Sequence, residues 1–129
     1  MEREYITTKR GTERSYSQAV KVKGGHTVYL AGVVNRDAEG KPVPGDFAVQ
    51  ARTALERLRD AVKLAGGTLD DIVNMTVFFT DSRNCDEFVK IRAEYFKANH
   101  YPASTLVTAS ALAFPWFQIE IQAIAVLDN

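Results

Sequence analysis

The sequence predicts an α+β fold in which two helices cover one face of a mixed six-stranded sheet, in the order β-β-β-α-β-α-β-β. Three patterns carry this prediction. Residues 117–127 alternate strictly between two faces, as a strand does. Residues 46–65 repeat their apolar side chains at helical spacing. Residues 72–80 are almost all apolar or β-branched, which is typical of a strand buried on both faces beside a crossover helix.

The first half of the chain predicts three strands followed by a helix. The strands cover residues 3–8, 18–23 and 27–34. The second and third form a hairpin through Gly24-Gly25, because paired glycines favour a tight turn. After a loop rich in Gly and Pro, Asp46 is a suitable N-cap for the helix, and Gly66-Gly67 ends it.

The second half predicts a helix between buried strands. Thr68 and Asp71 have the spacing of a small capping motif before the strand over residues 72–80. A second helix runs from about residue 82 to residue 98, and strands over residues 104–111 and 117–127 then pair with each other. Both helices belong on the same face of the sheet, since the crossover connections are right-handed.

The opposite sheet face is left uncovered and carries both apolar and polar side chains. Ile124 and Val126 lie on it, and an apolar sheet face of this kind is usually closed by a partner subunit. We therefore expect a homo-oligomer. Glu120 lies on the same face between two amides, which leaves two interpretations open: a solvated side chain, or a carboxylate held in a crevice.

Composition fits a single domain over residues 1–129 and excludes some classes of partner. The chain has 16 basic and 16 acidic residues and no basic cluster longer than a pair, so we expect no nucleic-acid partner. No apolar run approaches the ~20 residues of a membrane span, so we expect no membrane partner. A single cysteine, Cys85, and no apolar signal segment after Met1 predict a cytoplasmic protein.

Seven local strings, in order and at matching spacing, resemble the YjgF/RidA family of reactive-intermediate imine deaminases over nearly the whole chain. They are Ser15–Ala19, Val28–Gly32, Gln50–Leu55, Ala65–Ile72, Thr76–Asp81, Tyr101–Ala103 and Ile119–Ala125. The resemblance implies a chorismate-mutase-like homotrimer with the helices outside and three small-molecule clefts between subunits.

The resemblance also implies the chemistry. Family members hydrolyse enamines and imines such as 2-aminoacrylate to 2-keto acids and ammonia, with no metal and no cofactor. Glu120 matches the glutamate that orients or activates the attacking water. Tyr16 matches a conserved tyrosine, and Gly32 matches a glycine whose backbone lines the pocket.

The chain departs from the family pattern at the residue that binds the substrate carboxylate. Deaminases read Pro-Ala-Arg, and this arginine forms a two-pronged salt bridge; this chain has Ser104 instead. A frequent cysteine is replaced by Leu106, a frequent asparagine by Val89 and a frequent serine by Ala31. Each change makes the cleft less polar, so we expect a substrate preference shifted away from 2-aminoacrylate.

The walls of such a cleft are expected to be apolar. The candidates are Phe78, Leu106, Trp116 and Phe117. Trp116 follows a proline, and it could equally stack on a ligand or anchor its loop.

Two arginines could replace the missing cation. Arg14 lies two positions before Tyr16, but a solvated loop charge explains it more simply. Arg92 lies near the inner stripe of the second helix, where pairing with a surface carboxylate is the preferred interpretation.

Other chemistry-bearing residues favour structural roles. Cys85 lies on an amphipathic helix without a neighbouring His or Lys, which is typical of a core residue. His26 and His100 have no metal-ligand spacing, so we expect no metal site.

Two functions therefore remain after this comparison, a cofactor-free imine or enamine deaminase and a non-catalytic binding or regulatory trimer on the same fold. RNA cleavage, which has also been attached to the family, finds little support in a neutral chain without a histidine pair.

Overall fold

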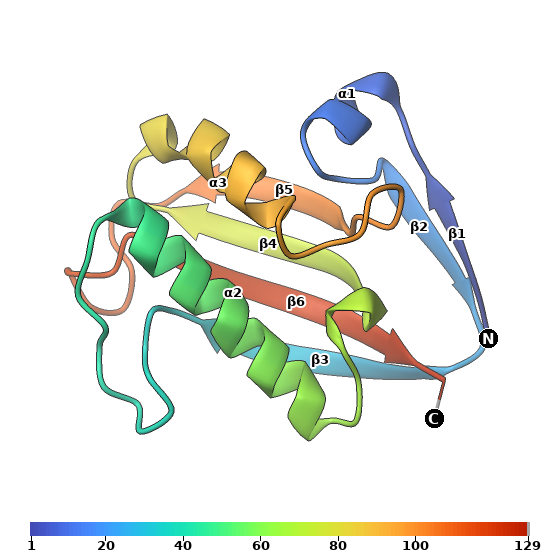
Figure 1. Ribbon diagram of the computed structural model, residues 1–129, viewed down its shortest axis with the longest axis horizontal. Helices are drawn as coiled ribbons and strands as arrows, with labels where there is room; N and C mark the ends of the chain where they lie inside the picture. The colour runs from blue at the N-terminus through green and yellow to red at the C-terminus, as the bar shows by residue number, and fades with distance from the viewer. Residues whose placement is uncertain (129) are drawn as a thin grey trace.

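The computed structural model describes residues 1–128 and confirms the α+β class (Figure 1). Its elements in chain order are β1 (Glu2–Ile6), α1 (Lys9–Glu13), β2 (Ala19–Lys23), β3 (His26–Val33), α2 (Phe47–Leu64), the 3₁₀ turn η1 (Leu69–Asp71), β4 (Ile72–Phe79), the 3₁₀ turn η2 (Ser82–Asn84), α3 (Cys85–Arg92), β5 (Ala103–Thr108) and β6 (Ile119–Leu127).

A four-stranded mixed sheet in the order β3-β6-β4-β5 forms the centre of the molecule, and α2 and α3 lie on the same face of it (Figure 1). β6 is antiparallel to both β3 and β4, whereas β4 and β5 are parallel and connected through α3. The alternation of residues 117–127 predicted the buried face correctly. Its odd-numbered side chains, Phe117, Ile119, Ile121, Ala123, Ala125 and Leu127, are all buried.

The prediction of one six-stranded sheet was wrong in its pairing, although all six strands exist. β1 and β2 pair with each other as a separate antiparallel ribbon, so the expected hairpin between β2 and β3 does not form. Gly24 and Gly25 adopt positive φ as a turn requires, but the chain there passes from one sheet to the other. The expected pairing of the last two strands is also wrong, because β4 lies between β5 and β6.

The ribbon is attached to the main sheet at its β5 edge. Ser17, just before β2, forms an isolated parallel bridge to Ala103. Its N–H donates to the carbonyl of Pro102 at 3.0 Å, and its hydroxyl donates to the carbonyl of Tyr101 at 2.6 Å. This attachment brings the segment between β1 and β2, including α1, next to α3 and β5.

The first long helix begins where the sequence predicts, and the second ends earlier than predicted. Asp46 caps α2, accepting from the N–H of Val49 at 3.0 Å, and Thr68 and Asp71 form the expected capping box. The second helix ends at Arg92 rather than near residue 98, because the N–H groups of Glu94 and Tyr95 bond three residues back, which tightens the chain into turns. The short α1 has no apolar periodicity and was not predicted.

The sheet face away from the helices remains open in a single chain. Tyr29 is 78% exposed on it, and Val107 and Gln122 are also exposed. β4 was expected to be buried on both faces, but its residues alternate between buried and half-buried, so only its helix face is covered. No helix in the described part of the chain is long and apolar enough to cross a membrane.

Candidate functional site

The candidate residues form two clusters on opposite faces of the main sheet. Neighbouring strands place paired residues on the same face. Ser104 pairs with Met75 across β5 and β4, and Met75 pairs with Ala123 across β4 and β6. All three side chains therefore point to the same face, which the helices cover. Glu120 pairs with Phe78, which lies three residues beyond Met75 along β4. Because side chains alternate along a strand, Phe78 and Glu120 point to the other, open face. Within one chain, Ser104 and Glu120 cannot face each other.

The first cluster brings Glu120 against Gly32. A side chain at position 32 would overlap the Oε2 atom of Glu120, so only glycine lets the carboxylate lie over β3 at this point. Register between β3 and β6 shifts between Leu30 and Val33, which places Gly32 and the exposed Ala31 at the irregularity. Within residues 1–128, the half-buried Glu120 carboxylate accepts no hydrogen bond and forms no ion pair.

The second cluster lines a cavity of about 220 Å³ between α1, α3 and β5. It collects six of the residues considered from the sequence and one further arginine, Arg10. The lining residues are Arg10, Arg14, Tyr16, Val89, Arg92, Ser104 and Leu106. Three arginines therefore line the cavity, and Val89 and Leu106 form its apolar wall.

Arg92 makes most of the polar contacts in this cavity. The sequence favoured a surface position paired with a carboxylate, and the structure contradicts that prediction. Arg92 is 1% exposed and pairs with no carboxylate in the described chain. Nη1 donates to the hydroxyl of Ser104 at 2.6 Å, and Nε donates to the hydroxyl of Ser15 at 3.1 Å. Nη2 donates to the carbonyl of Arg14 at 3.1 Å.

Two further contacts explain how a buried charge is tolerated here. The guanidinium lies over the ring of Phe88, one helical turn earlier, at 5.1 Å, and Nη1 also contacts the sulfur of Met75. Burial, reinforced by the nearby charge of Arg14, lowers the pKa of Arg92 to about 10. Arg92 is therefore still charged at neutral pH, although its surroundings disfavour the charge.

Ser15 holds this arrangement in place and was missed by the sequence reasoning. It is 2% exposed and adopts a positive φ of 59°, which is strained for a residue other than glycine. Its hydroxyl donates to the carbonyl of Val89 at 2.8 Å while it accepts from Arg92. The strained turn also directs the chain so that Arg14 and Tyr16, on either side, both line the cavity.

Arg14 was expected to be a solvated loop charge, but it lines the cavity and forms an ion pair. Its side chain is 28% exposed and donates to Asp86 at 3.0 Å, while Asp86 itself is 81% exposed. The ion pair therefore lies at the mouth of the cavity, where water weakens it.

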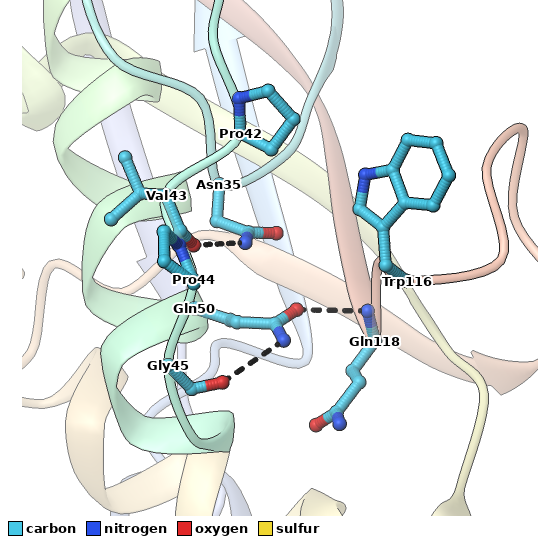
Figure 2. Close-up of a pocket in the computed structure, with 8 residues that line it drawn as sticks. All are labelled: Asn35, Pro42, Val43, Pro44, Gly45, Gln50, Trp116 and Gln118. Carbon is cyan, nitrogen blue, oxygen red and sulfur yellow. Dashed lines mark hydrogen bonds between the residues drawn. The ribbon is translucent and has the colours of Figure 1, made fainter.

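A larger cavity of about 600 Å³ lies at another edge of the molecule, between the loop before α2 and the loop before β6 (Figure 2). Trp116, 52% exposed, stands on one side of it, and Pro42 and Val43 stand on the other. Gln50 crosses the floor, accepting from the N–H of Gln118 at 2.9 Å. This cavity contains no ionisable group, so it offers shape but no acid–base chemistry.

Phe117 lies outside both cavities. It is 1% exposed and packs edge-on to Phe114, with Arg36 over its ring at 4.9 Å. Its expected role as a cleft wall is therefore not seen in a single chain, because its ring is buried just before β6 begins.

The remaining candidates are structural in this arrangement. Burial raises the pKa of the Cys85 thiol, which makes it a poor nucleophile. His100 packs edge-on against Tyr5 at 4.8 Å. Among residues 1–128, no group of three His, Cys, Asp or Glu side chains is placed to hold a metal ion.

Comparison with known proteins places the chain among relatives of known and unknown activity. The family model described as Endoribonuclease L-PSP matches residues 7–127. The RutC family protein YjgH of Escherichia coli is 36% identical over 114 residues, 88% of this chain and 83% of that protein. The human 2-iminobutanoate/2-iminopropanoate deaminase is 34% identical over 112 residues, 86% of this chain and 79% of that protein.

A solved structure supports the same relationship. The crystal structure of YyfB from Yersinia pestis, described as a protein of unknown function of the Rid family, has a TM-score of 0.88 at 30% identity. It covers 98% of this chain and 100% of that one. The chain therefore belongs to the Endoribonuclease L-PSP family, which is the YjgF/RidA family that its sequence resembles.

Proposed function

We propose that the protein is a cofactor-free hydrolytic deaminase of small enamines and imines, with a preference shifted away from 2-aminoacrylate. The observation that carries the proposal is the Glu120 carboxylate, which is half-buried against Gly32 and has no partner in the described chain. A carboxylate without a structural partner is free to hold and deprotonate a water molecule. The deaminase name of a human relative supports this class of reaction.

The reaction needs only proton transfers that one carboxylate can perform. Glu120 takes a proton from water as the water oxygen bonds to the imine carbon, and the electron pair of the C=N bond moves to nitrogen. Glu120 returns this proton to the nitrogen, which gives a carbinolamine. It then takes the proton of the carbinolamine hydroxyl and passes it to the amino nitrogen, so the carbon–nitrogen bond breaks and ammonia leaves as the carbonyl forms. An enamine enters the same sequence after protonation at its carbon.

A complete site requires two copies of the chain. Glu120 and Ser104 lie on opposite faces of one sheet, so one copy cannot present both to a single small molecule. We propose a homotrimer in which the open sheet face of one copy meets the cavity beside α3 of the next. The exposed Tyr29 and Val107 on the open face support burial by a partner.

The shifted preference follows from the residues beside Ser104. Val89 and Leu106 give the cavity an apolar wall, and a serine hydroxyl cannot form the two-pronged salt bridge that an arginine at this position would supply. An imine that carries a longer apolar group should therefore compete better here than 2-aminoacrylate does. The protein would work on such metabolites in the cytoplasm, without a nucleic-acid or membrane partner.

A non-catalytic binding protein is the second candidate, and Ser104 in the arginine position favours it. The two functions are separated by following ammonia release from imines generated in place by an amino-acid oxidase. Glu120→Gln should lower the enzyme-dependent rate by at least about a hundredfold, because it removes the base and preserves the shape. Leu64→Ala, at a residue 92% exposed at the end of α2 and away from the open sheet face, should leave the rate intact.

Equal rates for the wild type and Glu120→Gln would remove Glu120 from the mechanism. If the wild type itself gives no rate above the oxidase alone with any imine of the panel, the deaminase proposal fails and the binding function stands.

A further inference from the structure

Three guanidinium groups surround the cavity beside α3, although the whole chain has no net charge. Arg10, Arg14 and Arg92 all line it. The only carboxylate paired with any of them in the described chain is Asp86, which is 81% exposed and contacts Arg14 at the mouth. The cavity therefore has an excess of positive charge in a volume of about 220 Å³.

Arg92 is an unusual residue to bury without a carboxylate. Charged side chains are almost never fully buried unless they are paired, because removal from water is unfavourable by several kcal/mol. Within residues 1–128, its guanidinium contacts only hydroxyl and carbonyl oxygens, a sulfur and an aromatic ring. A bound anion would supply the missing countercharge.

Ser104 connects Arg92 to the cavity. Its hydroxyl oxygen accepts from Nη1 of Arg92 at 2.6 Å, and the hydroxyl finds no acceptor among the described residues. The hydroxyl hydrogen is thus available to a ligand, and a hydrogen bond from a cation makes that hydroxyl a stronger donor.

We propose that Arg92, acting through the Ser104 hydroxyl and with Arg14 at the mouth, replaces the family's arginine and makes this cavity a binding site for a small carboxylate. The inference rests on the proposed function, since it concerns the group that holds the substrate. It places the cation on α3, one layer behind β5, where Ser104 stands between it and the ligand.

This arrangement should hold the carboxylate more weakly and less directionally than the family's arginine does. A guanidinium has five N–H donors, and four are already directed at Ser15, Ser104, Met75 and the carbonyl of Arg14. The two-pronged salt bridge is therefore not available. The anion binds mainly through one hydroxyl and the charge behind it, so more of the affinity must come from the apolar part of the ligand.

Binding of pyruvate, the simplest 2-keto acid that imine hydrolysis would release, tests the inference without turnover. Titration calorimetry should show pyruvate binding to the wild type and much weaker binding of the uncharged pyruvamide. Arg92→Met should weaken pyruvate binding by about ten- to a hundredfold and leave pyruvamide binding unchanged. Arg83→Met is the matched control, because Arg83 is 89% exposed, pairs with Asp81 and does not line this cavity.

Two further variants keep the test decisive if Arg92→Met folds poorly. Ser104→Ala retains Arg92 and should still weaken pyruvate binding by about tenfold, because the connecting hydroxyl is lost. The double variant Arg92→Met/Ser104→Arg returns the cation to β5 and should restore pyruvate binding, which a purely structural role for Arg92 would not predict.

Unchanged pyruvate affinity in both Arg92→Met and Ser104→Ala would overturn the inference, as would equal binding of pyruvate and pyruvamide to the wild type. Neither result bears on the deaminase proposal, which is decided by ammonia release in Glu120→Gln. Loss of ammonia release in Glu120→Gln with pyruvate binding intact would leave the anion site standing.

Discussion

Replacing Gly32 by alanine should lower the catalytic rate and leave the free energy of unfolding nearly unchanged. A Cβ atom at this position would overlap Oε2 of Glu120 and would lie 3.0 Å from Cδ and 3.2 Å from Cγ. The carboxylate must then shift by about 1 Å to reach an ordinary contact, and a displacement of that size lowers a rate by about a hundredfold. Gly32 does not adopt a positive φ, so the substitution adds no backbone strain.

The free energy of unfolding should change by less than about 1 kcal/mol, because the atoms that move are the end of a flexible side chain, and alanine restricts the unfolded chain more than glycine. The assays are ammonia release for the rate and urea denaturation for the stability. Lys63→Ala, at an exposed position on α2, is the control and should preserve both. A Gly32→Ala protein with full turnover would refute the role given to the carboxylate at this position.

Three further predictions concern stability and reactivity. Leu55→Ala removes a side chain with 0% exposure from the middle of α2 and should lower the free energy of unfolding by about 2–5 kcal/mol, whereas Leu64→Ala, at a residue 92% exposed on the same helix, should change it by less than about 0.5 kcal/mol. Asp46→Ala removes the N-cap of α2 and should lower it by about 1 kcal/mol, and an unchanged urea midpoint would show that the cap is dispensable. Because the pKa of Cys85 is raised and the thiolate is the reactive form, alkylation by iodoacetamide should reach its half-maximal rate at a higher pH than an exposed cysteine in a peptide does; a lower pH would contradict the burial assigned to this thiol.

Local patterns predicted the elements of the fold well because they depend on neighbouring residues. The alternation over residues 117–127 identified the buried face of β6, and Asp46 and Thr68 marked the starts of α2 and η1. Strand pairing was less predictable. The glycines between β2 and β3 permit a hairpin, but burial of the apolar face of β6 between β3 and β4 decides which strands are neighbours.

The site was predictable only in part for a similar reason. Tyr16, Val89, Ser104 and Leu106 were expected near one another from the resemblance, and the structure brings them to one cavity. Arg92 was expected at the surface, since long charged side chains usually reach water. Its one useful signal was its place one helical turn after the buried Phe88, on the inner face of α3. Nothing in the sequence pattern pointed to Ser15 or its strained turn.

The central claim is that one site takes Glu120 from one copy and Arg92 with Ser104 from another. Mixing two impaired variants tests it directly, since Glu120→Gln lacks the base and Arg92→Met binds the anion weakly. The two kinds of subunit are unfolded together, refolded at equal amounts, and assayed for ammonia release at a low concentration of an anionic imine. Random assembly gives each interface an intact Glu120 and an intact Arg92 in about one case in four, so about a quarter of the wild-type rate should return. If the refolded mixture is no more active than the two variants refolded separately, the site does not form between copies and the account is wrong.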